Sequence, residues 1–262
     1  MVFTNRPVAM VTGAARRIGR EIALELAAAG HDMALHCRHS QAEAQATADA
    51  VRALGVRALV LVADLADEQQ CRALLPTVVE AFGRVDLVVN NASTFEYDQA
   101  DSFTYANLDR HCRANVAPAV VLAQALYTHL HAAGDGRSGC VVNLLDQKLW
   151  NLNPDHLSYT LSKAALQTAT VMLAQGLAPT VRVCGVAPGV TLLSGQMTDE
   201  EFAHAHTMTP LQRSSSPADV ARAVRFLAES LAITGTTVVV DGGQHLTSQT
   251  RDVQFLVRGT AT

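Results

Sequence analysis

Tyr159 and Lys163 stand four positions apart, a spacing that could serve proton transfer. A helix is expected over Ser158–Leu177, and residues four apart lie on one face of a helix. A nearby ammonium group favours the phenolate, so we expect Lys163 to lower the pKa of Tyr159 toward the range useful for catalysis. Chance produces this pattern often, so its meaning depends on the residues around it.

A turn with two glycines near the start of the chain could bind phosphate. Gly13 follows an apolar run, Val8–Val11, and Gly19 stands at the start of a helical pattern over Ile18–Ala29. Gly13 permits a tight turn, Gly19 lets the helix approach the sheet, and the free N–H groups at the helix N-terminus favour an anion. Because the turn stands in the first strand–helix unit, we predict a dinucleotide site there rather than an ordinary turn.

The residues after the second expected strand indicate which dinucleotide binds. Sites for NAD place a carboxylate about 20 residues beyond the glycines, but residues 36–40 include no acid. Arg38 and Ser40 could hold a 2′-phosphate through charge-assisted hydrogen bonds, and Arg16 could add positive charge. The sequence therefore predicts NADPH over NADH, although Arg38 could also be a solvated surface charge.

Short apolar runs alternate with longer helical patterns along the chain. The expected strands are 8–11, 33–36, 58–62, 87–90, 140–144, 181–186 and 237–240. The expected helices are 18–29, 42–54, 68–82, a stretch from about 102 to 131 that could divide near Asn115, 158–177 and 218–228. This alternation predicts a parallel sheet with helices on both faces, in which ligands bind at the carboxyl ends of the strands.

Composition limits the classes of protein and partner. With 262 residues, 49% of them hydrophobic and 17% charged, the chain suits one large ordered domain. The net charge of −4 argues against nucleic acid as a partner, and no apolar run has the roughly 20 residues that span a membrane. The first seven residues lack the apolar segment of a secretory signal, so we expect a cytoplasmic protein with five reduced cysteines and no metal site.

Further motifs follow the fourth and sixth expected strands. Asn91-Ala92-Ser93 and Pro188-Gly189 stand there, and Asn115 lies in the intervening helical stretch. With the glycine turn and the Tyr–Lys pair, these residues resemble the short-chain dehydrogenase/reductase family from Val8 to Leu246. The resemblance implies a Rossmann-type, doubly wound α/β fold with seven parallel strands, a single domain over 1–262, an NAD(P)-dependent reductase, and a homodimer or homotetramer.

The resemblance also implies roles for single residues. Tyr159 is the expected proton donor, Lys163 lowers its pKa and binds ribose, and Asn115 belongs to a water-linked proton path. Asp64 matches an acid that contacts adenine, and Thr191 a residue that contacts the carboxamide. The residues expected to bind the coenzyme are Gly13, Arg16, Arg17, Ile18, Gly19, Arg38, Ser40, Asp64, Leu65, Asn91, Ala92, Ser93, Tyr159, Lys163, Pro188, Gly189 and Thr191.

Two residues depart from the family pattern. Arg17 replaces the middle glycine of the turn, and Asp146 replaces the serine that usually lies thirteen positions before the tyrosine. An ionised carboxylate cannot donate a hydrogen bond to a ketone oxygen, and it would repel the developing oxyanion. Asp146 therefore suits a substrate with N–H donors, or one that is protonated at nitrogen.

Both departures resemble the pteridine reductase branch, which includes dihydrofolate and dihydromonapterin reductases. That branch also has an aromatic residue soon after Asn-Ala-Ser, which here is Phe95. Phe95 could stack on a flat ring opposite the nicotinamide, while Asp146 and Tyr159 deliver a proton to a ring nitrogen. The residues expected to contact substrate are Arg17, Ser93, Phe95, Asp146 and Tyr159.

Simpler interpretations exist for these residues. Phe95 could pack within a loop, Asp146 could cap a turn, and Arg17 could bind only the diphosphate. Trp150 and Leu152 could line the substrate pocket or belong to a core at the sheet edge.

The leading hypothesis is hydride transfer from NADPH to a C=N bond of a pterin- or folate-like small molecule. The alternatives are an NADPH-dependent carbonyl reductase of the 3-oxoacyl or small-ketone type, and a non-catalytic NADPH-sensing protein. The weakly patterned stretch 192–216 could be a substrate lid, and the tail 247–262 could be loose or pack on a partner chain.

Overall fold

The computed structural model describes residues 6–193 and 197–257. Within them, parallel strands form one seven-stranded sheet in the order β3-β2-β1-β4-β5-β6-β7. The strands are β1 (Val8–Val11), β2 (Asp32–Cys37), β3 (Ala58–Val62), β4 (Leu87–Asn90), β5 (Gly139–Leu144), β6 (Val181–Pro188) and β7 (Thr237–Val240). The order reverses between β1 and β4, and ligands of open parallel sheets bind at such a reversal.

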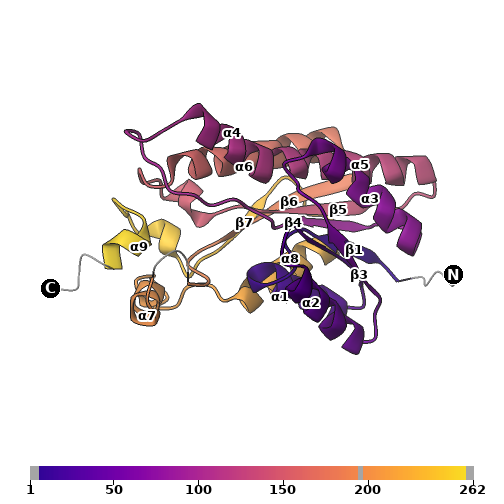
Figure 1. Ribbon diagram of the computed structural model, residues 1–262, viewed down its shortest axis with the longest axis horizontal. Helices are drawn as coiled ribbons and strands as arrows, with labels where there is room; N and C mark the ends of the chain where they lie inside the picture. Colours follow the sequence, from indigo (N-terminus) through magenta and orange to yellow (C-terminus); the bar gives the residue numbers. More distant parts are fainter. Residues whose placement is uncertain (1–5, 194–196, 258–262) are drawn as a thin grey trace.

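Helices cover both faces of the sheet (Figure 1). One face carries α1 (Arg17–Ala28), α2 (Gln41–Ala53) and α8 (Pro217–Glu229). The other carries α3 (Glu68–Phe82), α4 (Tyr105–Asn115), α5 (Ala117–Ala133) and α6 (Leu157–Gly176). The short helices are η1 (Gln147–Trp150), α7 (Asp199–Thr207), η2 (Gln244–Leu246) and α9 (Val253–Leu256), and α7 and α9 lie together at one end of the molecule.

The strands are apolar because both faces of the sheet are covered. Every residue of β1, β2, β4 and β5 is buried. Ile22 and Leu26 of α1 and Val224 of α8 belong to the core on one face, while Leu122 and Leu126 of α5 belong to the core on the other. Burial on both faces removes the polar alternation seen in half-exposed strands.

Local signals end several helices where the sequence predicts. The Asp67 side chain caps α3 by accepting two backbone N–H groups, and Gly83 ends that helix in the left-handed conformation (φ 83°). The long helical stretch divides at Val116, directly after Asn115. Most predicted strands and helices are confirmed within two residues of their ends.

Two short helices lie in segments that were expected to be irregular. Helix α7 falls in the stretch 192–216 and begins with a capping box between Thr198 and Glu201, which was its main sequence signal. Helix α9 falls in the tail. Residues 194–196 and 258–262 of these two segments lie outside the described residues, and closure of a lid stays a prediction.

The expectation of a loose tail is wrong for residues 247–257. The Arg251 guanidinium pairs with the Asp155 carboxylate at 2.9 Å, and the Gln254 side chain contacts the His156 ring at 2.6 Å. Val253 is buried against α7. Ion pairs and buried apolar groups therefore hold this segment on its own chain.

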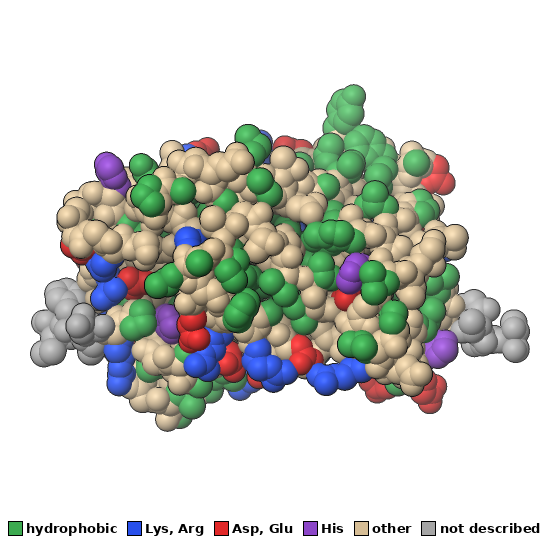
Figure 2. All heavy atoms as spheres, turned by 180° about the vertical axis from the view of Figure 1, so that it is seen from behind, with side chains coloured by type: hydrophobic (Ala, Val, Ile, Leu, Met, Phe, Trp, Pro, Cys, Tyr) green, Lys and Arg blue, Asp and Glu red, His purple; other side chains and the backbone are tan. Residues whose placement is uncertain are grey.

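Arginines gather along the side of the molecule covered by α1, α2 and α8 (Figure 2). Those on α8 are paired with acids: Arg222 contacts Asp219, and Arg225 contacts Glu25 and Glu229. The arginines of α8 named here therefore have their charge balanced by neighbouring acids.

Two further expectations concern the state of the cysteines and the lack of a membrane-spanning segment. All five cysteines are free and four of them are buried, while their redox state stays a prediction. Over the described ranges, no helix is long and apolar enough to cross a membrane.

Candidate active site

Two adjoining cavities open at the carboxyl ends of the strands. The first, here the glycine-loop cavity, has about 450 Å³ and lies among residues 13–19 and the ends of β2, β3 and β4. The second, the Tyr159 cavity, has about 240 Å³ and lies among the ends of β5 and β6, α6 and the C-terminal segment. Arg17, Ile18, Asn91 and Ser93 line both, so the cavities meet beside the end of β4.

The glycine loop is shaped by two glycines and by β4. Gly13 has φ +64°, and a Cβ atom on Gly19 would lie 2.2 Å from the Gly13 carbonyl oxygen. The Asn91 amide donates to the Thr12 and Gly13 carbonyl oxygens at 2.9 and 3.1 Å. The Thr12 hydroxyl accepts the N–H groups of Asn91 and Ala92, both at 3.0 Å. The loop is thus held tightly at the N-terminus of α1, where an anion is favoured.

His36 also holds the glycine loop, although no motif pointed to it. Its Nδ1 accepts the N–H of Gly13 at 3.2 Å, and its Nε2 lies 3.0 Å from the Ala63 carbonyl oxygen. The His36 carbonyl oxygen accepts the N–H of Ala14 at 2.9 Å. Burial lowers the pKa of His36, which favours the neutral ring that accepts at Nδ1. The sequence signal that could have pointed to His36 is its polar side chain within an otherwise apolar strand.

The polar residues expected near adenosine surround the same cavity. Arg38, Ser40 and Asp64 line it together with Arg16 and Leu65. The Arg38 side chain is 54% exposed and lies 3.9 Å from the Asp64 carboxylate, so it keeps donors free for a second anion. Positive charge therefore stands where an NAD site has a carboxylate.

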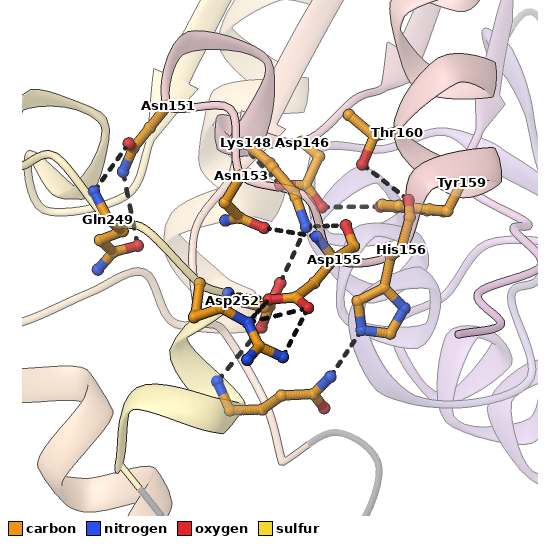
Figure 3. A network of polar contacts seen from close by, with 12 residues as sticks. Asp146, Lys148, Asn151, Asn153, Asp155, His156, Tyr159, Thr160, Gln249 and Asp252 are labelled. Atoms are coloured by element: carbon orange, nitrogen blue, oxygen red, sulfur yellow. Dashed lines mark hydrogen bonds and ion pairs between the residues drawn. The ribbon is translucent and has the colours of Figure 1, made fainter. Parts of the chain in front are cut away.

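Asp146 and Tyr159 meet in the second cavity. The Tyr159 hydroxyl donates to Asp146 Oδ2 at 2.7 Å (Figure 3). Asp146 Oδ1 accepts the N–H of Lys148 at 2.9 Å and caps η1. The capping and catalytic interpretations of Asp146 are therefore compatible, because the two oxygens do different things.

The charges around this pair are buried. Burial raises the pKa of Asp146. Burial, followed by the charge of Asp146, raises the pKa of Tyr159 well above its usual value. The Lys163 ammonium donates to the Leu144 carbonyl oxygen at 2.7 Å, and burial lowers its pKa to about 8. The expectation that Lys163 lowers the pKa of Tyr159 is wrong here, because Asp146 contacts the phenol directly while the ammonium contacts β5.

Asn115 lies behind the loop that follows β4 and lines neither cavity. Its Oδ1 accepts the N–H of Thr94 at 2.7 Å and the Ser93 hydroxyl at 3.2 Å. Its Nδ2 donates to the Ser162 hydroxyl of α6 at 3.0 Å. Asn115 thus fixes the loop that carries Ser93, and its part in a proton path stays a prediction.

Phe95 lines the Tyr159 cavity and is 43% exposed. One face of its ring stacks on His156, with centroids 4.1 Å apart and planes 21° apart. Its ring also meets the Tyr159 ring at nearly a right angle, 4.7 Å between centroids. Loop packing thus uses part of the ring, and the exposed part faces the cavity.

Arg17 adopts the left-handed conformation (φ 57°), which is uncommon for residues other than glycine. Its guanidinium donates to the Leu193 carbonyl oxygen at 2.9 Å, so it links the glycine loop to the segment after β6. Pro188, Gly189 and Thr191 line the cavity next to it. Arg17 can therefore reach either cavity.

Trp150 and Leu152 line neither of the two cavities and are 39% and 68% exposed. These two residues therefore do not line either cavity, and their exposed side chains do not fit a core at the sheet edge.

The C-terminal part of the chain completes the Tyr159 cavity. Gln244, Gln249, Asp252 and Val253 line it, opposite residues of η1 and the following loop. Figure 3 shows Asn151 of this loop facing Gln249 and Asp155 lying beside Asp252, where the two segments meet. No motif pointed to these residues, because the tail has no periodic pattern and its amides are common on surfaces.

The chain is similar to known reductases over most of its length. A family model described as enoyl-(acyl carrier protein) reductase matches residues 13–245. An uncharacterised oxidoreductase of Methylorubrum extorquens is 34% identical over 244 residues, which are 90% of this chain and 96% of that protein. The 3-oxoacyl-(acyl-carrier-protein) reductase FabG of Staphylococcus aureus is 32% identical over 243 residues, 91% of this chain and 98% of that protein.

A solved structure is similar at a higher identity. The crystal structure of FolM alternative dihydrofolate reductase 1 from Brucella suis, in complex with NADP, has 41% sequence identity and a TM-score of 0.88. The similarity covers 95% of this chain and 98% of the other.

Proposed function

The chain belongs to the short-chain dehydrogenase/reductase family, and on that premise we propose that it reduces a C=N bond of a pterin- or folate-like ring with NADPH. The observation that carries the proposal is the contact between Tyr159 and Asp146, at the position where the family usually has serine. The similarity to the FolM structure, at 41% identity over 95% of the chain, supports the same substrate class.

The residues of the glycine-loop cavity fit a dinucleotide with a 2′-phosphate. Gly13 and Gly19 let the loop pack closely on Asn91 and on the N-terminus of α1, where a Cβ atom would meet protein atoms, and this turn directs backbone N–H groups toward a diphosphate. Arg38 and Ser40 would hold the 2′-phosphate, and Asp64 the adenine end. NADPH, when bound, supplies the hydride.

The pair of Asp146 and Tyr159 holds protons next to the reacting bond. Both groups have raised pKa values, because burial disfavours their charged forms. The pair would donate one proton to the ring nitrogen as the adjacent carbon receives hydride, which balances the reduction. Lys163 would fix the geometry by binding ribose, since its amine is already anchored to β5.

Phe95 and Arg17 would orient the ring. The exposed part of Phe95 offers a flat apolar surface at the cavity, and Arg17, which lines both cavities, offers N–H donors. Offset stacking on an aromatic ring favours a flat heterocycle over an acyl chain.

An assay that follows NADPH absorbance with dihydropterin, dihydrofolate, and quinonoid and oxidised pterins tests the proposal. We expect turnover of at least one of them. Absence of turnover with all of them, together with good turnover of a keto-ester, would reject it.

A carbonyl reductase of the 3-oxoacyl type is the second candidate, because FabG of Staphylococcus aureus is 32% identical to this chain. Asp146→Ser separates the two. The pterin proposal predicts loss of activity on pterins, since serine cannot supply the acid. The ketone proposal predicts that ketone reduction is kept or rises, since the hydroxyl donates to the oxyanion.

Assembly into two or four copies is proposed on the same resemblance, and a cytoplasmic location stays a prediction from the sequence. Light scattering on the purified protein tests the first.

A further inference from the structure

His156 stands at the start of the helix that carries Tyr159, although it lines neither cavity (Figure 3). Its backbone has φ 54°, in the left-handed region that costs most side chains free energy. The residue is only 3% exposed, and its ring stacks on Phe95. Because such a conformation persists only where the surroundings fix it, the contacts of the ring show what holds it there.

Both ring nitrogens of His156 are held by distant segments. Nδ1 lies 3.1 Å from the Glu96 carbonyl oxygen, and Nε2 lies 2.6 Å from the side-chain nitrogen of Gln254. A carbonyl oxygen only accepts, so Nδ1 carries the hydrogen, and Nε2 of the neutral ring accepts from Gln254. Burial lowers the pKa of His156, which favours this neutral ring. Partners 60 and 98 residues away along the chain therefore fix the plane of the imidazole.

Ring contacts extend from this fixed imidazole to the cavity. Phe95 stacks on His156 at 4.1 Å between centroids and meets the Tyr159 ring nearly at a right angle at 4.7 Å. The rings of Tyr97 and Phe255 also pack on His156, at 5.1 and 6.5 Å between centroids. Phe95 thus keeps one orientation relative to the phenol, although 43% of its surface is exposed.

We infer that His156 is a positioning residue, which holds the Phe95 ring in the orientation that lets a flat substrate ring stack beside Tyr159. Gln254 in turn holds the imidazole. The inference rests on the proposed function and deepens it, because it makes the C-terminal segment a determinant of affinity for flat rings although Gln254 lines neither cavity. The gain in affinity arises because a side chain that is already ordered loses less entropy when the ligand binds.

Calorimetry with the protein saturated with NADP⁺ measures the Kd for pterin in single and double variants. His156→Asn removes the imidazole and fits the backbone, because asparagine adopts positive φ more readily than most residues. We expect this variant to raise the Kd about 2- to 10-fold, since Phe95 must then be ordered on binding. Gln254→Met keeps the imidazole and removes only its hydrogen bond, so it should raise the Kd by a smaller factor.

The double variant with Phe95→Leu decides whether His156 acts through Phe95. Once the aromatic ring of Phe95 is gone, His156→Asn should raise the Kd no further, so the effects of the two substitutions are not additive. His131→Asn is the matched control, because it also removes a histidine ring that stacks on an aromatic neighbour, Tyr127 of α5, and lines neither cavity. The control should keep the wild-type Kd, and the Tm of each variant shows whether it is folded.

Several results would overturn the inference. Additive effects of His156→Asn and Phe95→Leu would mean that His156 acts on another part of the site, such as Tyr159 on the same helix. An unchanged Kd in both His156→Asn and Gln254→Met would mean that Phe95 needs no support. Where His156→Asn does not fold, Gln254→Met takes its place in the double variant with Phe95→Leu.

The binding measurement involves no turnover, so it separates this inference from the proposed function. Non-additive effects in a protein that reduces no pterin would support the inference and reject only the proposed reaction. Additive effects in a protein that reduces pterins would reject only the inference. A wild-type protein that binds no pterin would refute both.

Discussion

Gly19→Ala should damage coenzyme binding, because the new methyl group has no room. Its Cβ would lie 2.2 Å from the Gly13 carbonyl oxygen and 2.5 Å from the Asn91 amide nitrogen. Carbon atoms normally approach other heavy atoms to about 3.5 Å, so the loop would have to move by more than ~1 Å. The loop resists such a shift, since Asn91 and His36 both hold Gly13.

The size of the effect follows from two opposing terms. Forcing an extra carbon into a packed site costs roughly 1–3 kcal/mol. Alanine gains up to about 1 kcal/mol over glycine within a helix, and Gly19 lies in the first turn of α1. Displacement of the loop should therefore prevail, and we expect the Kd for NADPH to rise about tenfold or more.

Fluorescence titration with NADPH measures this Kd, and circular dichroism confirms that the variant is folded. Gly176→Ala is the matched control, because Gly176 ends α6 and a Cβ atom added there would have no neighbour within 4 Å. That control should keep the wild-type Kd and Tm. A Gly19→Ala protein that binds NADPH within about twofold of the wild type would refute the reasoning.

Three further predictions concern single side chains. Tyr159→Phe should abolish turnover and leave the Kd for NADPH nearly unchanged; unaltered turnover would mean that the proton comes from elsewhere. Lys163→Met should lose turnover, yet raise stability near neutral pH by up to about 3 kcal/mol in urea unfolding, because it removes a buried ammonium whose pKa is lowered to about 8. In the wild type, the free energy of unfolding should rise as the pH increases from about 8, the pKa of Lys163 in the folded protein, to about 10.4, the pKa of lysine in an unfolded chain. The variant should lack that rise. His36→Leu should raise the KM for NADPH with little change in kcat, and His36→Asn, which keeps an acceptor near Gly13, should partly restore it; equal KM values in both would argue against the hydrogen bond to Gly13.

The fold, the glycine turn and the Tyr–Lys pair of the site can be predicted from local sequence signals. The glycine turn, the Tyr–Lys pair and the alternation of apolar runs with helices each depend on neighbours within a few residues, and these are the features that the structure reproduces. Arg17 and Asp146 could also be singled out from the sequence, since each replaces the residue that the family pattern usually has at that position.

The remaining contacts of the site join segments that are distant along the chain. Helical spacing places Lys163 near Tyr159, but it says nothing of Asp146, which the turn after β5 brings to 2.7 Å from the phenol. Because the contact with Asp146 could not be foreseen from helical spacing, the predicted lowering of the Tyr159 pKa was wrong. His36 and His156 contact partners 23 and 98 residues away along the chain, and no periodicity records such pairs.

The two halves of the site come from widely separated parts of the polypeptide. Residues 13–94 enclose the place for the coenzyme, whereas Gln249 and Asp252 leave the ribosome much later. A nonsense codon or a proteolytic cut just before Gln249 would spare the glycine-loop cavity and remove Gln249, Asp252 and Val253 from the lining of the Tyr159 cavity. Such a shortened protein would keep the residues expected to bind the nucleotide but lose part of the enclosure around an acceptor.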